Sequence, residues 1–501
     1  MAAQNRNCKV KRLALMGLLF ALAMALSFLE SLLPALPMLP PGIRLGLSNI
    51  VTMYALFVLG PVSGYTIAVL KSLFVLLTRG AVAAAMSASG GIASVTVMLL
   101  LSLLPGIRRQ YLLLSVFGGA AHNVGQLIGD SEAAVSAPIH SSVSGKVKAI
   151  EQIFNARGAK SEAIVITTDG EQTIDETLTP PAIGAELEDV LVAARACGLM
   201  GLGGAGFPTS VKLVGLKSAA IDTLVINGAE CEPYLTCDYR IMLEKTDLLL
   251  EGAELILRHM PGGRAVIGIE NNKPKAIEKI KADAAAKGSK LEVLELKSRY
   301  PQGAEKVIVY EATGRVIPEG KLPSDVGVLV MNVGTVIKLA EYVKTGLPLT
   351  SRMVTVDGGA VAEPKNVWVP IGTKLEDIIN FCGGYKGEPA EIILGGPMMG
   401  TSCRDDQTPI SKTNNGLLVF NEKEAKMAAE TACIRCGRCL RACPLSLSPA
   451  ALDRAYHAED VEALKALHVN LCMECGCCAY VCPAKRHLVA YNQLGKQMIK
   501  K

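Results

Sequence analysis

The chain has 501 residues, of which 50% are hydrophobic and 19% are charged, and its mean hydropathy is +0.34. This length allows about three domains, and the composition excludes a disordered chain. The net charge of +5 is uneven: residues 1–128 hold nine Lys or Arg and one acid, which leaves 42 basic and 45 acidic residues to 129–501. Because the basic residues flank apolar runs and do not cluster with aromatic ones, nucleic-acid binding is not expected.

The first 128 residues contain four long apolar runs, at 13–37, 46–60, 62–78 and 83–104. Runs of about 18 apolar residues are typical of membrane helices, and a signal peptide would explain only the first run. Basic residues at 6–12 and at 108–109 predict that both ends are cytoplasmic, with four spans between them. We therefore expect N-terminal membrane helices, a multi-span segment at 1–128, with a buried helical core as the alternative.

The next apolar run, 111–128, contains His122, Asn123 and Gln126. If it crossed the bilayer, the rest of the chain would lie outside the cell, where reduced cysteines are not expected. We expect this run to be interfacial or incomplete. A turn-rich segment follows and then a strand-like alternation, which predicts a partial hybrid barrel at 129–152.

Helices and strands then alternate up to residue 345, which predicts an α/β domain at 153–345. The expected helices are 184–197, 240–259 and 274–287, and the expected strands are 163–167, 223–227, 265–269 and 327–332.

A glycine loop with the spacing G-x-G-x-x-G lies at 201–206. Such a loop lets backbone N–H groups approach a phosphate, and Lys212 is close enough in sequence to reach the same group. The segment before the loop has a helical period, so the loop does not fit the usual dinucleotide-binding fold. A plain turn rich in glycine is the alternative.

Acidic side chains follow the strand that ends at Asn227, in the segment Gly228–Asp238. In α/β sheets ligands sit at this edge, so Glu230 and Glu232 are candidates to accept hydrogen bonds from a flavin or a ribose; a solvated loop is the alternative. Two later segments, Tyr300–Glu305 and Asn332–Thr335, have the same strand-end character.

The strongest motif is a repeat in which C-x-x-C-x-x-C-x-x-x-C-P occurs at Cys433 and again 39 residues later at Cys472. It is the two-cluster ferredoxin signature, in which the fourth cysteine of each motif ligates the other cluster. One [4Fe–4S] cluster is therefore expected on Cys433, Cys436, Cys439 and Cys482, and the other on Cys472, Cys475, Cys478 and Cys443. Zinc is the rival metal, because C-x-x-C pairs also bind it. Cys477 is off register and is expected to bind no iron.

Taken together, these motifs resemble the FMN- and NADH-binding subunit of respiratory complex I and, more closely, the C subunit of the Rnf ion-translocating oxidoreductase complex. The resemblance covers about residue 124 to the C-terminus. It implies a flavin pocket in which the glycine loop and Lys212 hold the FMN phosphate, Asn227 and Glu230 face the flavin, and Phe207 and Glu232 face NADH. The remaining pocket residues it implies are Gly201, Gly203, Gly204, Gly206, Gly303, Glu305, Asn332 and Thr335. The chain has Ala229 and Met331 where the complex I pattern has an acid and an asparagine.

The same resemblance implies an SLBB-like β-grasp module at 346–400, expected to act as a spacer, then a connector at 401–430. A two-cluster ferredoxin-like α domain is expected at 431–492, with two short helices between the motifs. Residues 44–51 and 118–126 of the N-terminal segment resemble the Gx transporter family, also described as heptaprenyl diphosphate synthase component I. Prenyl transfer is not expected there, because 1–128 contains no aspartate to bind a metal diphosphate.

The resemblance implies an electron-transfer subunit of a membrane-bound, ion-translocating oxidoreductase complex, with FMN, two [4Fe–4S] clusters and NADH as substrate. Its expected partners are the other membrane subunits and ferredoxin, at the cell membrane with the soluble part on the cytoplasmic side. The sequence leaves two alternatives open: a membrane transporter with a redox appendage, and a chimera whose N-terminus has no role.

Overall fold

A computed structural model describes residues 17–25, 51, 61–79, 121–156, 158–204, 206–217 and 221–500. The chain divides into two compact units, residues 1–117 and 118–501. In the first unit residues 17–25 are helical and α3 covers Pro61–Arg79. No helix among the described residues is long and apolar enough to cross a membrane. The expected span 62–78 coincides with α3 and is therefore not supported, while the other three expected spans lie mostly outside the described residues.

Short strands of the barrel begin earlier than the sequence predicts. The strands β1 (Ala121–His122) and β2 (Leu127–Gly129) lie in the stretch expected to belong to the membrane segment. β1 pairs with β4 (Gly145–Phe154), and β2 pairs with β3 (Ile139–His140). The run 111–128 was expected to be interfacial or incomplete, and the strands contradict an interfacial segment at 121–128. These residues pair with downstream strands, which a local apolar pattern does not reveal.

The barrel also continues beyond its expected end at 152. β4 forms a long antiparallel hairpin with β5 (Lys160–Thr168), in a three-stranded sheet of order β1-β4-β5. The expected strand 163–167 therefore belongs to this hairpin and not to the α/β sheet. The prediction failed because a strand's period says nothing about which sheet it joins.

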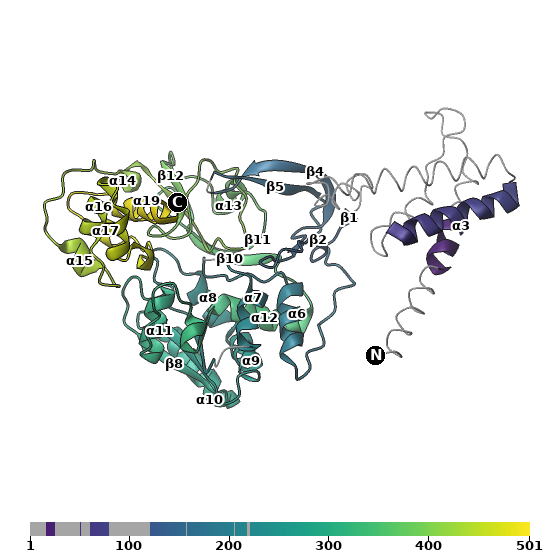
Figure 1. The fold of residues 1–501 in the computed structure, drawn as a ribbon, viewed down its shortest axis with the longest axis horizontal. Helices are drawn as coiled ribbons and strands as arrows, with labels where there is room; N and C mark the ends of the chain where they lie inside the picture. The colour runs from purple at the N-terminus through teal and green to yellow at the C-terminus, as the bar shows by residue number, and fades with distance from the viewer. Residues whose placement is uncertain are drawn as a thin grey trace. The chain divides into compact units, whose positions relative to one another are not determined.

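The α/β domain is built on a parallel sheet of order β8-β7-β6-β9. Its edge strand β8 is labelled in Figure 1 near α10 and α11. The strands of this sheet are β6 (Thr223–Asn227), β7 (Arg264–Glu270), β8 (Leu291–Leu296) and β9 (Val328–Asn332). β6 pairs with β9 in register, so that Asn227 lies opposite Asn332 at the carboxyl edge. β8 was not expected from the sequence, because Glu292 and Glu295 are three residues apart and break the period of two that marks a strand.

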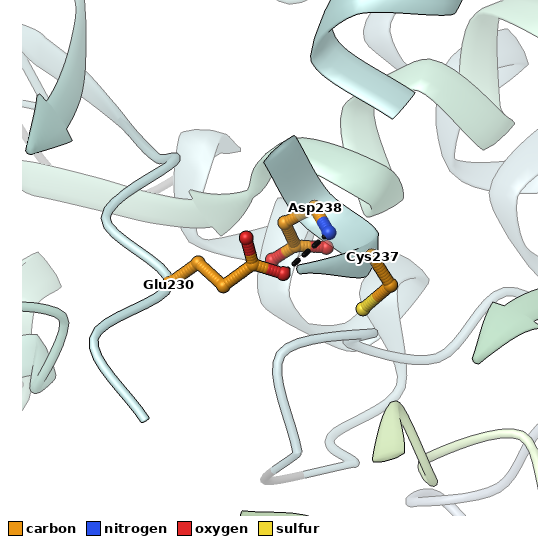
Figure 2. A group of neighbouring side chains, drawn as sticks. All are labelled: Glu230, Cys237 and Asp238. Atoms are coloured by element: carbon orange, nitrogen blue, oxygen red, sulfur yellow. Dashed lines mark hydrogen bonds between the residues drawn. The ribbon is translucent and has the colours of Figure 1, made fainter. Parts of the chain in front are cut away.

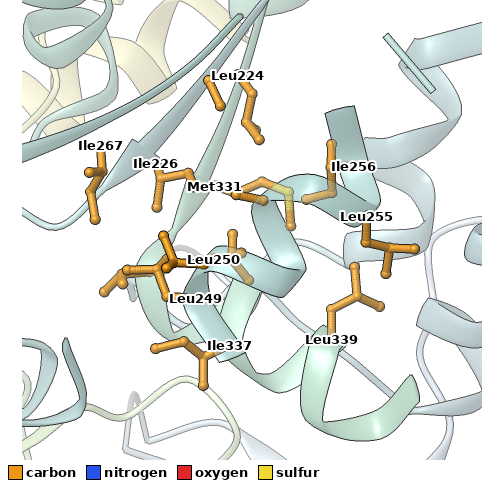
Figure 3. Packing of buried hydrophobic residues seen from close by; sticks show 14 of the residues in the cluster. Leu224, Ile226, Leu249, Leu250, Leu255, Ile256, Ile267, Met331, Ile337 and Leu339 are labelled. Carbon is orange, nitrogen blue, oxygen red and sulfur yellow. The ribbon is translucent and has the colours of Figure 1, made fainter. Parts of the chain in front are cut away.

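Side-chain alternation divides this sheet between two cores. Leu224 and Ile226 on β6 point into the larger core, whereas Val225 packs on the opposite face. The larger core is shown in Figure 3 and gathers residues from the sheet and from helices α6, α9, α10 and α12. The smaller core includes Ile308 and Val309 of α11. Helices on both faces account for the mostly apolar strands.

The helices of this domain are α6 (Leu187–Ala196), α7 (Thr209–Val214), α8 (Cys237–Glu244), α9 (Thr246–Leu257), α10 (Pro274–Lys287), α11 (Glu305–Thr313) and α12 (Val333–Thr345). The expected helix 240–259 is two helices, because the backbone leaves the helical region at Lys245. Glu305 begins α11 and Thr335 lies in the first turn of α12. Asn332 is the last residue of β9 and caps α12, so the segment 332–335 does lie at a strand end, as the sequence predicts.

The next module has a five-stranded sheet of order β11-β10-β14-β12-β13. Its elements are β10 (Ser351–Asp357), β11 (Lys365–Pro370), α13 (Leu375–Phe381), β12 (Glu391–Leu394), β13 (Thr401–Ser402) and β14 (Gly416–Phe420). β14 pairs with both β10 and β12, so it is the central strand. The expected connector at 401–430 is therefore wrong for these residues, since a five-residue buried strand carries no alternation to mark it.

The C-terminal domain is helical and is coloured yellow in Figure 1. After α14 (Glu422–Ala425) it contains α15 (Arg438–Ala442), α16 (Pro449–His457), α17 (Val461–Ala466), α18 (Cys477–Tyr480) and α19 (Leu488–Lys500). Between the two cysteine motifs lie α16 and α17, the two short helices that the sequence predicts. Leu452, Leu464 and Val469 form the core beneath them.

Candidate functional site

One cavity of about 1090 Å³ opens where the α/β domain, the β-grasp module and the barrel hairpin meet. All of the residues that the sequence assigns to flavin or NADH line this cavity: Gly201, Gly203, Gly204, Gly206, Phe207, Lys212, Asn227, Glu230, Glu232, Gly303, Glu305, Asn332 and Thr335. They come from segments more than a hundred residues apart. The fold therefore gathers the whole candidate set in a single place.

The glycine loop is held by backbone contacts on both sides. Gly201 N donates to Phe207 O at 2.8 Å, and Leu202 N donates to Thr335 Oγ1 at 2.9 Å. A Cβ on Gly203 would lie 3.2 Å from the Cβ of Asn332, so glycine is needed for close packing there. Gly204 has φ +103°, and a Cβ added there would meet no atom within 4 Å. The loop therefore presents bare backbone to the cavity, which fits a phosphate group.

Two asparagines shape the floor at the carboxyl edge of the sheet. Asn227 Nδ2 donates to Gly303 O at 2.7 Å, and Asn332 Nδ2 donates to Asp238 Oδ2 at 2.7 Å. At the side of the cavity Lys212 Nζ lies 3.1 Å from Glu305 Oε1, and both side chains are partly exposed. Lys212 is thus positioned near the glycine loop, as the sequence predicts, with a carboxylate as its partner.

A buried acidic pair lies beside these asparagines. Figure 2 shows Glu230, Cys237 and Asp238, whose polar atoms lie within 4.8 Å of one another. The Glu230 carboxylate accepts the backbone N–H groups of Asp238 and Tyr239, at 2.6 and 3.0 Å. Burial, and next the nearby Asp238 charge, raise the pKa of Glu230 to about 8. Burial also raises the pKa of Asp238. The pair therefore retains a proton near neutral pH, because two buried carboxylates so close do not both ionise readily.

This raised pKa predicts a pH-dependent stability. In the folded chain Glu230 binds a proton that the unfolded chain has already released, so its contribution is fully present below about pH 4.5 and is lost as pH rises toward about 8. We expect Glu230→Gln, which keeps an acceptor oxygen, to melt about 5 °C or more above the parent at about pH 9 and to show little difference at about pH 5. Thermal melts at both pH values measure this. Glu459→Gln, at an exposed carboxylate, is the control, and its melting temperature should differ from that of the parent by the same amount at both pH values. If the melting temperatures of the parent and of Glu230→Gln changed equally with pH, the raised pKa of Glu230 would be contradicted.

Glu232 lies on the side of the cavity that faces the C-terminal domain. Its Oε2 accepts the backbone N–H of Met398 at 3.0 Å, and burial raises the pKa of this carboxyl. Glu232 Oε1 and the Tyr300 hydroxyl are both buried, and the Tyr300 hydroxyl lies close enough to the carboxylate to lower its pKa, against the larger effect of burial. Such polar atoms facing a cavity suit a polar ligand.

Several lining residues were missed by sequence reasoning. Asp238 is not one of them, because it is the third acid of the segment Gly228–Asp238, which the sequence places at the ligand edge of the sheet. The missed residues come from the hairpin tip and from the β-grasp module, including Ile153, Asn155, Ser161, Met399, Ser411, Thr413 and Asn415. The module was expected to be a spacer with a packing role, with a ligand site left possible, and its residues also line the cavity. No local signal marks these residues, because they reach the cavity through tertiary packing.

A second, smaller cavity brings cysteines of both motifs together. It is lined by Cys443 of the first motif and by Cys472, Cys475, Cys478 and the off-register Cys477 of the second. Leu447 N donates to Cys443 Sγ at 3.4 Å, and Asn492 Nδ2 donates to Cys472 Sγ at 3.3 Å. Hydrogen bonds to ligand sulfurs are typical of iron–sulphur sites. These side chains fit one of the two expected cubane clusters.

The other cysteine set is partly assembled by contacts between the motifs. Cys439 packs against the buried cluster that contains Cys482. Thr431 N donates to Ala484 O at 2.9 Å, which brings the start of the first motif beside the end of the second. Cys433 and Cys436 are exposed. Among the residues described, no disulfide pairs any cysteine.

The backbone repeats with the same 39-residue spacing as the cysteines. Left-handed φ values occur at Arg435 and Glu474, at Gly437 and Gly476, and at Ser446 and Lys485. The two cysteine motifs therefore form loops with the same backbone turns at matched positions. The repeat is present in the structure as well as in the sequence.

The second cysteine loop lies against the larger cavity. Met473 lines both cavities. Cys477 Sγ lies 3.9 Å from Tyr300 O. A Cβ on Gly476 would lie 3.1 Å from Met398 O, so this loop packs closely on the β-grasp turn.

A glycine-lined cavity with buried carboxyls, next to paired cysteine loops, is the arrangement of a flavin and iron–sulphur electron-transfer protein. Family models agree domain by domain. They match the RnfC barrel sandwich hybrid domain at 114–171, the Nuo51 FMN-binding domain at 194–341, the SLBB domain at 353–402 and the 4Fe-4S dicluster domain at 430–486. A model of heptaprenyl diphosphate synthase component I matches 19–134. The chain therefore carries an FMN-binding domain and a two-cluster iron–sulphur domain, as the sequence predicts.

Curated relatives define the family more closely. The chain is 46% identical over 331 residues to the C subunit of the proton-translocating ferredoxin:NAD(+) oxidoreductase complex of Clostridium ljungdahlii, covering 66% of this chain and 72% of the relative. It is 40% identical over 328 residues to the C subunit of the Na(+)-translocating ferredoxin:NAD(+) oxidoreductase complex of Acetobacterium woodii, covering 65% and 74%. The C subunit of the ion-translocating oxidoreductase complex of Rhodobacter capsulatus is 38% identical over 343 residues, with 68% and 66% covered. The chain belongs to this family of C subunits, and the expected resemblance is confirmed.

Proposed function

We propose that the chain is the electron-transfer subunit of an ion-translocating ferredoxin:NAD(+) oxidoreductase complex. The observation that carries this proposal is the adjacency of the two cavities, one lined by the candidate flavin residues and one by four of the repeated cysteines, with Met473 common to both. When bound, a flavin exchanges two electrons as a hydride and also transfers single electrons, while a cubane cluster carries one. A single chain that holds both groups converts between the two modes.

In this proposal the residues of the larger cavity hold FMN and NADH. The bare backbone of the glycine loop and the Lys212 ammonium face the phosphate, and Asn227 and Glu230 face the flavin ring. Phe207, nearly half exposed on the cavity wall, offers a flat apolar surface to the nicotinamide or adenine of NADH. The Glu232 carboxylate faces the polar groups of NADH.

The cysteine sets differ in their distance from the cavity. Cys472, Cys475, Cys478 and Cys443 hold the nearer cluster, since Met473 and Tyr300 connect their loop to the cavity wall. Cys433, Cys436, Cys439 and Cys482 hold the farther one. This order supports a path in which the nearer set exchanges electrons with the flavin and the farther set exchanges them with a partner, ferredoxin or another subunit of the complex.

We further propose that the chain resides at the cell membrane with its redox domains on the cytoplasmic side, attached through the apolar runs of residues 1–128. The sequence pattern supports this part of the proposal, as do the names of the translocating relatives. Removal of residues 1–123 separates the alternatives. An anchored electron-transfer subunit would keep its cofactors and lose membrane attachment, a transporter with a redox appendage would lose transport, and a chimera with a functionless N-terminus would lose no activity.

The test is to purify the full chain without oxygen and to assay iron, sulphide and FMN. We expect about eight irons and about one FMN per chain, and paramagnetic resonance signals of reduced clusters after NADH addition. In cell fractionation the chain should stay with the membranes after a high-salt wash. Iron without FMN would remove the flavin assignment, and a chain without iron would overturn the proposed function.

A further inference from the structure

The two cysteine loops have the same backbone but different surroundings. The second loop packs against the cavity wall through Met473, Gly476 and Cys477. In the first loop Ile434 is 67% exposed and Leu440 is 49% exposed. The first loop therefore presents to the outside a surface whose counterpart in the repeat is only partly exposed at four of the five matched positions, Tyr480 being the exposed one.

Charge also distinguishes the two loops. Arg435, Arg438 and Arg441 are exposed, and no ion pair joins any of them to another residue in the described part of the chain. The matched positions 39 residues later hold Glu474, Cys477 and Tyr480, none of which is basic. Residues 431–452 contain no Asp or Glu. The positive charge is therefore specific to the first loop.

The arginines are interleaved with cysteines. Arg435 lies between Cys433 and Cys436, and Arg438 lies between Cys436 and Cys439. A molecule bound to these guanidinium groups would consequently lie over the group that the cysteines hold. This position distinguishes the surface from an ordinary basic patch, because binding there places a partner at the electron exit.

We propose that Ile434, Arg435, Arg438, Leu440 and Arg441 form a docking face for an acidic one-electron carrier protein. The inference rests on the proposed function, since it needs a cluster on the first cysteine set. Carboxylates of the partner would meet the three arginines, and an apolar patch would meet Ile434 and Leu440. Opposite charges steer encounters and raise association rates without a large interface, which suits a carrier that must leave after each transfer.

The test uses the full chain with its cofactors and a small acidic two-cluster ferredoxin as the probe. Stopped-flow mixing measures the second-order rate constant of electron transfer at low and high salt. The triple variant Arg435→Gln, Arg438→Gln, Arg441→Gln should lower this constant at low salt by about tenfold or more. The parent's rate should fall with salt, and the variant's should depend on salt much less.

A matched control removes the same charge elsewhere. Arg258, Lys275 and Lys321 are exposed on the α/β domain, and replacing all three by Gln should leave the rate within about twofold of the parent, because their charges lie away from the docking face. Iron content and NADH reduction of the clusters show that each variant is intact. If the triple variant is intact and keeps the parental rate and salt dependence, the docking face is overturned and the proposed function still stands. If NADH does not reduce the clusters of the parent, the proposed function itself is overturned.

Two further arms keep the test decisive. If the triple variant loses iron, the single variant Arg441→Glu is used in its place, because Arg441 lies in the longer spacing between Cys439 and Cys443. This variant should slow electron transfer at least fivefold. An unchanged rate would overturn the proposal. Sedimentation with phosphatidylglycerol vesicles tests a lipid partner. Loss of vesicle binding in the arginine variant with an unchanged ferredoxin rate would likewise overturn it.

Discussion

Replacing Cys443 by alanine should remove the iron–sulphur cluster held by the other motif, lowering the iron content from about eight to about four atoms per chain. The reason is geometric, because Cys443 lines one cavity with Cys472, Cys475 and Cys478. The surviving cluster should still be reduced by dithionite. It should no longer be reduced by NADH, since the lost set is the one beside the flavin cavity.

Pairs of substitutions separate this arrangement from one in which each motif closes its own cluster. If the clusters exchange their fourth ligand, adding Cys472→Ala to Cys443→Ala should cost no further iron, and adding Cys436→Ala should remove the rest. If each motif is self-contained, these two results are reversed. The single variant Cys482→Ala supplies the control, because it should retain a cluster that NADH reduces.

The second large effect is expected at the glycine loop. Gly204→Val should reduce the FMN retained by the purified chain to less than about a tenth, because the new side chain would extend into space that the backbone now leaves open to the phosphate. The left-handed φ of +103° adds a backbone cost of about 1–3 kcal/mol. Flavin released on denaturation gives the FMN content, and iron analysis reports on the rest of the fold.

Gly320→Val provides a matched comparison for the backbone cost. Gly320 has φ +75°, and a Cβ added there would also meet no atom within 4 Å. Unlike Gly204, Gly320 does not line the cavity. We expect a similar loss of stability there with normal FMN content. Normal FMN content in Gly204→Val would show that the loop does not hold the phosphate.

Some features could be predicted from sequence because they are local. The cysteine repeat follows from spacing alone, since three thiolates of one loop must grip one cluster. The central strands at 223–227 and 265–269 follow from short apolar runs, and α10 was placed at its observed limits because a proline and a glycine bracket it. The flavin and NADH residues required more than pattern. They were transferred through a family resemblance, and the structure brings them into one cavity.

Other features depended on contacts between distant segments. The pairing of β4 with β5, the central place of β14 and the entry of Ser411, Thr413 and the hairpin tip into the cavity leave no local trace, because a strand's sequence does not specify its partner. The raised pKa of Glu230 arises from burial beside Asp238, which neither residue type implies. The sequence by itself thus determined which chemical groups the chain holds, because ligand type and spacing are local properties. The tertiary structure alone decided which cysteine set meets the cavity and which faces outward, because two loops with the same backbone are told apart only by what packs against them.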